Sequence, residues 1–480
     1  IHSMKRLNLF LLGACVAASS LYAQSEDWKA GVAKVKDLIK TNPEMAEEQA
    51  DDLLKGKNKK NVELVLAIGR AYLDAGQLEQ ADDYAKLAKK ADSKSAIVSV
   101  FEGDIAVARK DPGTASQRYE EAIYFDPNCK EAYLKYADIY KAANPSLATG
   151  KLEELRAIDP QAVEVDRKLA EIYYSANQFD KAADAYARFA EGDKATENDL
   201  VKYSFALFLN HNFEKSLEVA NLGLQKNPQH AVFNRLRMYN FIDLKRYDEA
   251  KEAANAFFGA CKVEDLTYLD YLYHGTLLEA LKVYEDAVVS LEKAYDMNKE
   301  RSEVLNQIAS CYESAGKYEE AINAFNKYVE TLPEDKRTPD LVFQLGRMYY
   351  GEGTTTDSIN YTPEMKTAAL HKADSTFGKL AELVPDNYLG NFWRARTNSA
   401  LDPETTAGLA KPYYEQVATL LADKAKEDSR YNRYLIECYR YLGYYYLVAE
   451  KYEESKEYWN KILAIDPEDA IATKALEGIK

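Results

Sequence analysis

The chain has 480 residues, of which 47% are hydrophobic, and it carries a formal net charge of −16 at pH 7. A single globular core would be unusual at this length, whereas stacked repeats can grow without such a limit. The acidic balance excludes nucleic acid and anionic lipid as general partners, because both repel a negatively charged surface.

Residues 1–23 have the pattern of an export signal. Met4-Lys5-Arg6 is a short basic start, and Leu7 to Ser20 is mostly apolar but too short to remain as a membrane span. Leu21-Tyr22-Ala23 places a small residue before Gln24, which predicts cleavage after Ala23. We therefore expect an exported chain that is periplasmic or associated with the outer membrane.

A second interpretation of the same segment is a lipid anchor. Leu12-Gly13-Ala14-Cys15 resembles a lipoprotein box, with Gly13 a less favoured residue at its place. No later segment is long and apolar enough for a membrane helix, so we expect no transmembrane segment in the mature chain. Removal of residues 1–23 takes away Lys5 and Arg6 and no acids, so the mature charge would be −18 against −16.

Residues 24–61 are expected to form an N-terminal helical cap. One apolar stripe ends at Asn42-Pro43 and a second ends at Gly56; they comprise Trp28, Val32, Val35 and Ile39, then Met45, Ala46, Ala50, Leu53 and Leu54. Neither stripe fits the repeated sequence pattern that begins at Val62 and is described below. We therefore expect this segment to cover the exposed first face of a stack.

The stretch 302–335 is the clearest copy of a repeated pattern. Two apolar helical stripes flank Gly316, and Pro333 ends the second one; the stripes are Leu305, Ile308, Ala309 and Tyr312, then Tyr318, Ala321, Phe325 and Tyr328. A glycine between two helices suits a turn that needs positive φ. The pattern predicts a helical hairpin, which needs neighbours to bury both stripes.

The same pattern recurs with a period of about 34 residues from Val62 to Asp469. Small residues mark the eighth and twentieth places of the register and large ones the eleventh and twenty-fourth, as in Gly69, Tyr72 and Ala81, or Gly443, Tyr446, Ser455 and Trp459. This pattern resembles the tetratricopeptide repeat (TPR) family. The resemblance implies an all-α, right-handed superhelical solenoid of about eleven helical hairpins over 62–469. It says little about function, because this fold serves many partners.

One long insertion interrupts the repeat period of about 34 residues. Residues 351–368 are polar and are expected to form a loop, with a binding role left open. Asp357-Ser358-Ile359 and Asp374-Ser375-Thr376 resemble a short O-glycosylation acceptor of some bacterial envelopes. Residues 470–480 are expected to form a C-terminal capping helix.

No catalytic signature is present in the sequence. The histidines are isolated, and there is no His-Glu-x-x-His pair, no Gly-x-Ser-x-Gly elbow and no phosphate-binding loop. We therefore expect no enzyme activity, no cofactor and no metal site. Cys129, Cys261, Cys311 and Cys438 lie in separate units that cannot touch, so no disulfide is expected.

The resemblance suggests a binding groove, because the first helix of each TPR hairpin lines the concave side. The fifth and ninth residues of that helix lie one turn apart and face the same way. In the C-terminal units arginines alternate there with aromatic residues, which suits an acidic or carboxyl-bearing peptide. The predicted groove residues are Arg235, Tyr239, Asn306, Phe343, Arg347, Phe392, Arg396, Arg440 and Tyr444. The alternative is that each arginine pairs with an acid on the adjacent helix.

These observations predict a non-enzymatic scaffold of the bacterial cell envelope that binds a partner protein or peptide along its groove. One alternative is an accessory subunit of an envelope enzyme, secretion or transport complex, and another is a lipid-anchored surface module. Lys135, Lys168 and Lys202 are not joined by the asparagines of a carboxylate clamp, so recognition of chaperone tails is not expected. The sequence indicates neither the identity of the partner nor the oligomeric state.

Overall fold

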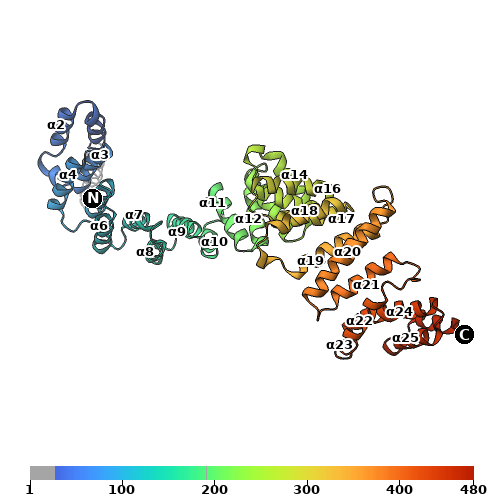
Figure 1. Cartoon of the computed structure of the whole chain (residues 1–480). Helices are drawn as coiled ribbons and strands as arrows, with labels where there is room; N and C mark the ends of the chain where they lie inside the picture. Colours follow the sequence, from blue (N-terminus) through green and yellow to red (C-terminus); the bar gives the residue numbers. More distant parts are fainter. Residues whose placement is uncertain (1–27, 191, 480) are drawn as a thin grey trace, which may run out of the picture. The chain divides into compact units, whose positions relative to one another are not determined.

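The computed structural model describes residues 28–190 and 192–479 (Figure 1). Helices are the regular secondary structure of these residues, and no strand occurs among them. The predicted signal segment 1–23 lies outside the described residues. The chain divides into two compact units, Ile1–Leu236 and Arg237–Lys480, and the division falls inside helix α13 (Ala231–Asp243).

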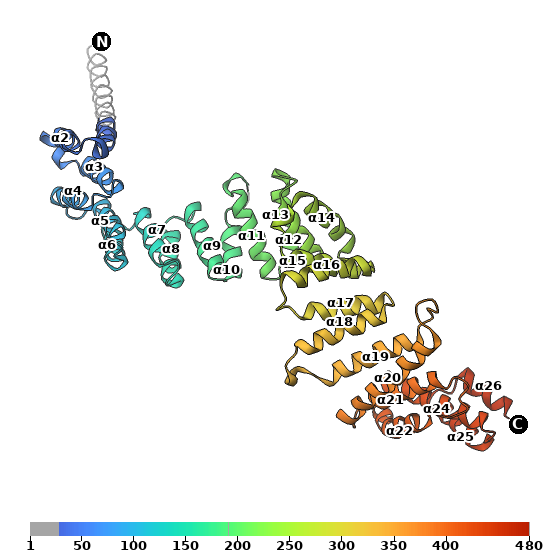
Figure 2. The ribbon, with the colours of Figure 1, turned by 45° about the horizontal axis from the view of Figure 1, so that its top comes forward.

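The first unit is a row of helical hairpins (Figure 2). A helix over residues 28–41 is followed by α2 (Pro43–Leu53), the 3-10 turn η1 (Gly56–Lys60), α3 (Val62–Asp74), α4 (Leu78–Ala91), α5 (Ala96–Ala108), α6 (Pro112–Phe125), α7 (Lys130–Tyr140), α8 (Pro145–Ile158), α9 (Val163–Ser175), α10 (Phe179–Ala187), η2 (Gly192–Lys194), α11 (Glu197–Leu209) and α12 (Phe213–Lys226).

The second unit continues the same alternation after α13. Its elements are α14 (Tyr247–Ala260), η3 (Val263–Asp265), α15 (Tyr268–Ala280), α16 (Tyr284–Met297), α17 (Glu303–Ser314), α18 (Tyr318–Thr331), η4 (Glu334–Lys336), α19 (Pro339–Thr354), α20 (Pro363–Leu383), α21 (Leu389–Leu401), α22 (Lys411–Ala422), α23 (Lys424–Glu427), η5 (Ser429–Tyr431), α24 (Asn432–Val448), α25 (Tyr452–Ile465) and α26 (Ala470–Gly478). The predicted all-α architecture of stacked helical hairpins is confirmed for the described residues.

In two hairpins the small eighth residue of the register meets the large twenty-fourth residue. A Cβ added at Gly443 would lie 2.8 Å from the ring of Trp459, and one added at Gly275 would lie 2.6 Å from the side chain of Leu291. In both hairpins the glycine is the eighth residue and the large side chain is the twenty-fourth. The two helices of a hairpin therefore approach closely because one side chain is missing where the other is bulky.

The insertion differs from the predicted loop over 351–368. Its ends extend α19 and α20, so that only residues 355–362 lie between the two helices. Leu370 and the buried Gly353 pack together, since a Cβ on Gly353 would lie 2.5 Å from the Leu370 side chain. This apolar contact stabilises helix where the polar composition indicated a loop.

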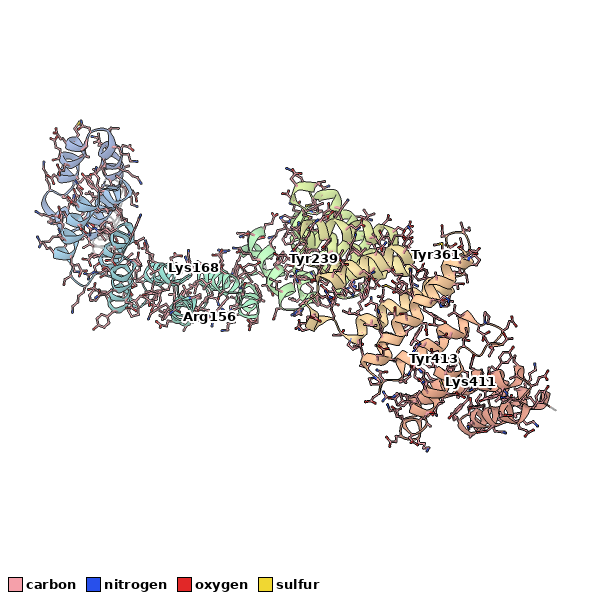
Figure 3. All side chains as sticks on the ribbon, in the orientation of Figure 1. Arg156, Lys168, Tyr239, Tyr361, Lys411 and Tyr413 are labelled. Atoms are coloured by element: carbon pink, nitrogen blue, oxygen red, sulfur yellow. The ribbon has the colours of Figure 1, made fainter. Side chains whose placement is uncertain are left out.

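Tyr361 attaches the remaining loop to the preceding hairpin (Figure 3). Its hydroxyl accepts a hydrogen bond from the backbone N–H of Tyr318 at 2.8 Å and donates one to the carbonyl of Gly316 at 2.9 Å. The ring is buried and meets the Tyr318 ring edge-on. The insertion thus caps the start of α18, whose own N-cap residue provides no side-chain hydrogen bond.

Candidate protein-binding surface

In the first unit, ion pairs join the first helices of successive hairpins. Lys135 binds Asp104 at 2.7 Å, Lys168 binds Asp138 at 2.6 Å, and Lys202 and Glu171 are 3.4 Å apart. In each pair the acid is the ninth residue of its unit and the lysine is the sixth of the next. The three lysines considered for a carboxylate clamp are therefore engaged within the protein.

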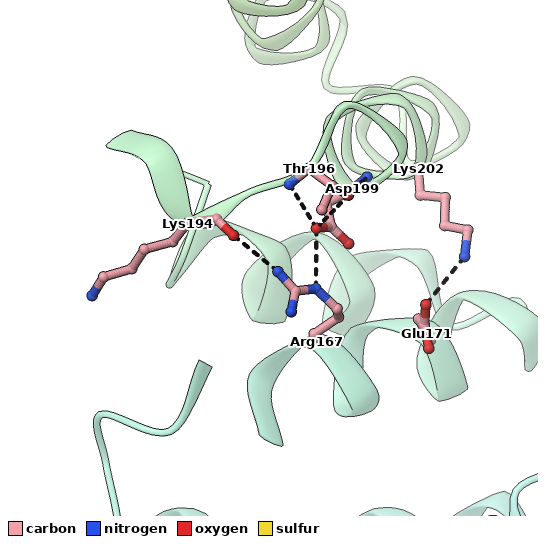
Figure 4. Close-up of polar contacts among 6 residues, drawn as sticks. All are labelled: Arg167, Glu171, Lys194, Thr196, Asp199 and Lys202. Carbon is pink, nitrogen blue, oxygen red and sulfur yellow. Dashed lines mark hydrogen bonds and ion pairs between the residues drawn. The ribbon is translucent and has the colours of Figure 1, made fainter. Parts of the chain in front are cut away.

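Asp199 connects two helices at the junction shown in Figure 4. Arg167 on α9 donates from Nε to Asp199 Oδ2 at 3.0 Å and from a terminal nitrogen to the carbonyl of Lys194 at 2.9 Å. The same carboxylate caps α11, because it accepts from the backbone N–H and the hydroxyl of Thr196 at 2.9 and 2.8 Å. One buried acid thus stabilises a helix start and the contact with the preceding unit.

In the second unit, three of the predicted groove arginines pair with acids. Arg347 binds Glu313 at 2.8 Å, Arg396 holds both carboxylate oxygens of Glu437 at 2.7 Å, and Arg440 binds Asp469 at 2.8 Å. The alternative left open by the sequence is the arrangement observed for these three. Arg235, the fourth arginine, is partly buried.

The paired arginines remain partly accessible. The exposed fraction of the side chain is 46% for Arg347, 34% for Arg396 and 40% for Arg440. The Arg396 guanidinium also lies 4.5 Å from the centre of the Phe392 ring and 5.1 Å from that of Trp393. Arg347 is thus the most accessible of the three, and Arg396 is held from two sides.

The predicted aromatic residues lie at different depths. Tyr239 (Figure 3) and Phe392 are core residues, and the Tyr239 hydroxyl donates to Asp270 at 2.7 Å. Phe343 is partly buried and meets Trp393 edge-on. Tyr444 is 44% exposed. Tyr239 and Phe392 therefore do not present their rings on the surface.

Asn306 completes the predicted set. Its side-chain oxygen accepts a hydrogen bond from Gln344 at 3.0 Å, which links two successive first helices. The structure thus engages most of the predicted groove residues in contacts within the protein, and their role in binding a partner stays a prediction.

Sequence reasoning missed Arg433, at the start of α24. Its guanidinium lies 4.5 Å from the centre of the Tyr434 ring, and within the described residues it has no carboxylate partner. The residue was missed because it precedes the last repeat in the register, outside the fifth and ninth places. No signal in the sequence singles it out, because Arg396 and Arg440 likewise have no acid one 34-residue period away.

Two further findings concern the described residues alone. No group of three or more His, Cys, Asp or Glu side chains is arranged to hold a metal ion, and no helix is long and apolar enough to cross a membrane. Cys311 and Cys438 are buried thiols, and burial raises the pKa of Cys311 to about 12.

Comparison with known proteins identifies repeats of one kind in both units. Family models described as tetratricopeptide repeat match residues 165–191 and 280–338. The chain therefore contains tetratricopeptide repeats, at places where the structure has α9–α10 and α16–α18. No curated protein matches the chain.

Several solved structures are similar to parts of the chain. The C-terminal part of a TPR repeat-containing protein from Cytophaga hutchinsonii is 29% identical, with a TM-score of 0.46 over 57% of this chain and 99% of that one. A tetratricopeptide repeat protein from Parabacteroides merdae is 14% identical, with a TM-score of 0.32 over 52% and 98%. Pseudomonas aeruginosa pilF is 16% identical, with a TM-score of 0.33 over 44% and 96%.

Proposed function

We propose that the protein is a non-enzymatic scaffold of the cell envelope that binds a partner protein or peptide along its first helices. The observation that carries the proposal is the presence of tetratricopeptide repeats in both units, since such repeats build extended binding surfaces. The competing proposal is an accessory subunit of an envelope enzyme, secretion or transport complex, built on the same surface.

The paired arginines define how a partner would bind in the second unit. A carboxylate of the partner would compete with Glu313 for Arg347. It would need to replace only one contact, because Arg347 is accessible and binds Glu313 through a single contact. At Arg396 it would have to displace a two-pronged contact with Glu437. We therefore expect Arg347 and the exposed Tyr444 to contribute more to binding than Arg396 or Arg440.

The location in the envelope rests on the pattern of residues 1–23. Intact mass spectrometry of the mature protein tests it, because a chain that begins at Gln24 supports cleavage and release. An acylated Cys15 would instead support a lipid-anchored surface module.

Co-purification under mild detergent tests the scaffold. A partner that is recovered in variable amount and dissociates on dilution supports a free scaffold, whereas a fixed stoichiometry supports the accessory subunit. Recovery of no protein partner from envelope fractions would contradict both.

A further inference from the structure

A hollow of about 560 Å³ opens between the α20–α21 turn and the segment before α24. Pro385, Asp386 and Tyr388 line one side, and Lys424 and Tyr431 line the other. On the turn, Pro385 contributes an apolar ring and Asp386 a carboxylate. On the opposite side, Lys424 contributes an ammonium group and Tyr431 a phenol. A pocket of this size accommodates one large side chain of a ligand.

Two cations, Lys424 in the lining of the hollow and Arg433, which is connected to the lining through Tyr434 and Tyr388, are not neutralised by a carboxylate within the described residues. Lys424 donates from Nζ to the backbone carbonyl of Asp386 at 3.3 Å, a neutral acceptor. Arg433 lies over the Tyr434 ring and donates to the Tyr434 hydroxyl. The nearby Arg430 differs, because its guanidinium binds Asp428 at 2.7 Å.

The rings around the hollow form one connected cluster. The ring centre of Tyr388 lies 5.9 Å from that of Tyr431, with the planes at 89°, and 4.9 Å from that of Tyr434. Hydrogen bonding with Tyr388, followed by interaction with Arg433, lowers the pKa of the Tyr434 phenol. The cluster therefore links Arg433 to the wall of the hollow.

We propose that this hollow binds an acidic peptide segment of a partner, with an apolar or aromatic side chain between Pro385, Tyr388 and Tyr431 and flanking carboxylates on Lys424 and Arg433. Arginine and tyrosine at a concave site are the composition typical of binding hot spots. The site rests on the proposed function and specifies the chemistry of the partner.

The charge distribution favours a peptide with separate carboxylates. Lys424 and Arg433 lie on different elements, so two carboxylates spaced along a chain can reach both. Asp386 in the wall repels a compact dianion but accepts hydrogen bonds from peptide N–H groups. On a chain with a net charge of −16, cations without a carboxylate partner are a local attraction for an acidic segment.

The test uses a fluorescein-labelled peptide, Glu-Asp-Leu-Phe-Asp-Glu, and its analogue in which every acid is replaced by the corresponding amide. Fluorescence polarisation measures binding of each to the full chain. We expect the acidic peptide to bind, and both Arg433→Ala and Lys424→Ala to weaken it about tenfold. The matched control Arg430→Ala removes the same charge three residues away and should change affinity less than about twofold.

Three outcomes would overturn the site: no binding of the acidic peptide to the unmodified chain, equal binding of the amide analogue, or an equal effect of Arg430→Ala and Arg433→Ala. The outcome also distinguishes the site from the proposed function. Peptide binding that depends on Arg347 and Arg396 but not on Arg433 leaves the scaffold in place and removes this site. Binding that depends on Arg433, with no partner recovered from envelope fractions, keeps the site and removes the envelope scaffold.

Discussion

At the scale of single residues, the turn inside eight of the hairpins has one left-handed backbone position. This is the fifteenth place of the register, and φ there lies between 57° and 78° in eight hairpins. Only two of them use glycine; the residues are Gly76, Lys110, Asn177, His211, Lys245, Lys282, Gly316 and Glu450. Since the left-handed region is costly for residues with a Cβ, six hairpins carry strain that glycine would relieve.

Lys282→Gly should raise the free energy of unfolding by about 0.5–1 kcal/mol, because φ at Lys282 is 62° and glycine adopts it without a Cβ penalty. Urea denaturation monitored by circular dichroism measures the change. The reverse exchange, Gly316→Lys, is the control and should lower stability, since a Cβ there meets no atom within 4 Å and only the backbone conformation is affected. Stability unchanged in both variants would contradict the assignment of strain.

Gly443→Leu should lower the free energy of unfolding by about 1–3 kcal/mol, because the added side chain overlaps the buried Trp459 ring. Thermal denaturation measures the loss. Gly259→Leu serves as control, since a Cβ at Gly259 has no atom within 4 Å. An equal effect of the two exchanges would mean that overpacking is not the cause.

At the scale of elements, single side chains at helix starts and loops join one hairpin to the next. Asp199 does so for α9 and α11, and Asp270 has the same arrangement at α15, where it accepts from Thr267 and from the Tyr239 hydroxyl. Tyr361 joins the insertion to the start of α18 through the hydrogen bonds of its hydroxyl. These contacts lie between helices, so their loss should loosen a junction more than a helix.

Asp199→Ala should lower the free energy of unfolding by about 2–3 kcal/mol, because it removes the carboxylate half of the capping box of α11 together with the ion pair to Arg167. Chemical denaturation measures the cost. Lys202→Ala, on the same helix, removes only a pair with long 3.4 Å geometry and should cost less than about 1 kcal/mol. Comparable losses for both variants would contradict a special role of Asp199.

Tyr361→Phe should destabilise the insertion by about 1–2 kcal/mol, because the N–H of Tyr318 loses its acceptor while the ring stays in place. Limited proteolysis should then cut within 355–362 faster than in the unmodified chain. Tyr124→Phe is the control, since Tyr124 is exposed and its hydroxyl has no partner among the described residues. An unchanged cleavage rate in Tyr361→Phe would show that the hydroxyl does not hold the loop.

At the scale of the whole molecule, the distribution of charge sets which groups a partner of the proposed scaffold would meet. The chain is acidic, but within its repeats acids and bases pair across junctions in both units. Such pairs are partly exposed, so each contributes little to stability. A carboxylate of a partner would therefore replace the acid of such a pair at little cost. In the proposed binding mode a partner's carboxylates replace the acids of such pairs, and Lys424 and Arg433 add two cations that have no carboxylate partner within the described residues.

The double exchange Arg347→Glu/Arg396→Glu should weaken binding of a co-purified partner at least about tenfold, because the new carboxylates face Glu313 and Glu437. Helicity in circular dichroism should stay unchanged. The control Arg301→Glu/Arg430→Glu alters net charge equally at two exposed arginines of the same unit. Affinity that survives the first double exchange would remove the groove arginines from the binding surface.

The fold class follows from the sequence alone, because the places of small and large residues repeat with the hairpin. Gly443 and Trp459 show this: their spacing predicts a close helix contact, and the structure has it. Local patterns of this kind are readable because both partners lie within one repeat.

Which of these groups are accessible depends on how neighbouring hairpins stack. Arg347 and Glu313 are 34 residues apart, one full period, and Arg396 and Glu437 are 41 apart, so each pair forms only when neighbouring hairpins stack. Burial of Tyr239 and Phe392, and helix in place of loop over much of 351–368, likewise depend on what an adjacent hairpin brings near. A hydrophobic period fixes which face of a helix is buried, but pairing and exposure at its edge depend on distances between repeats that the period does not contain.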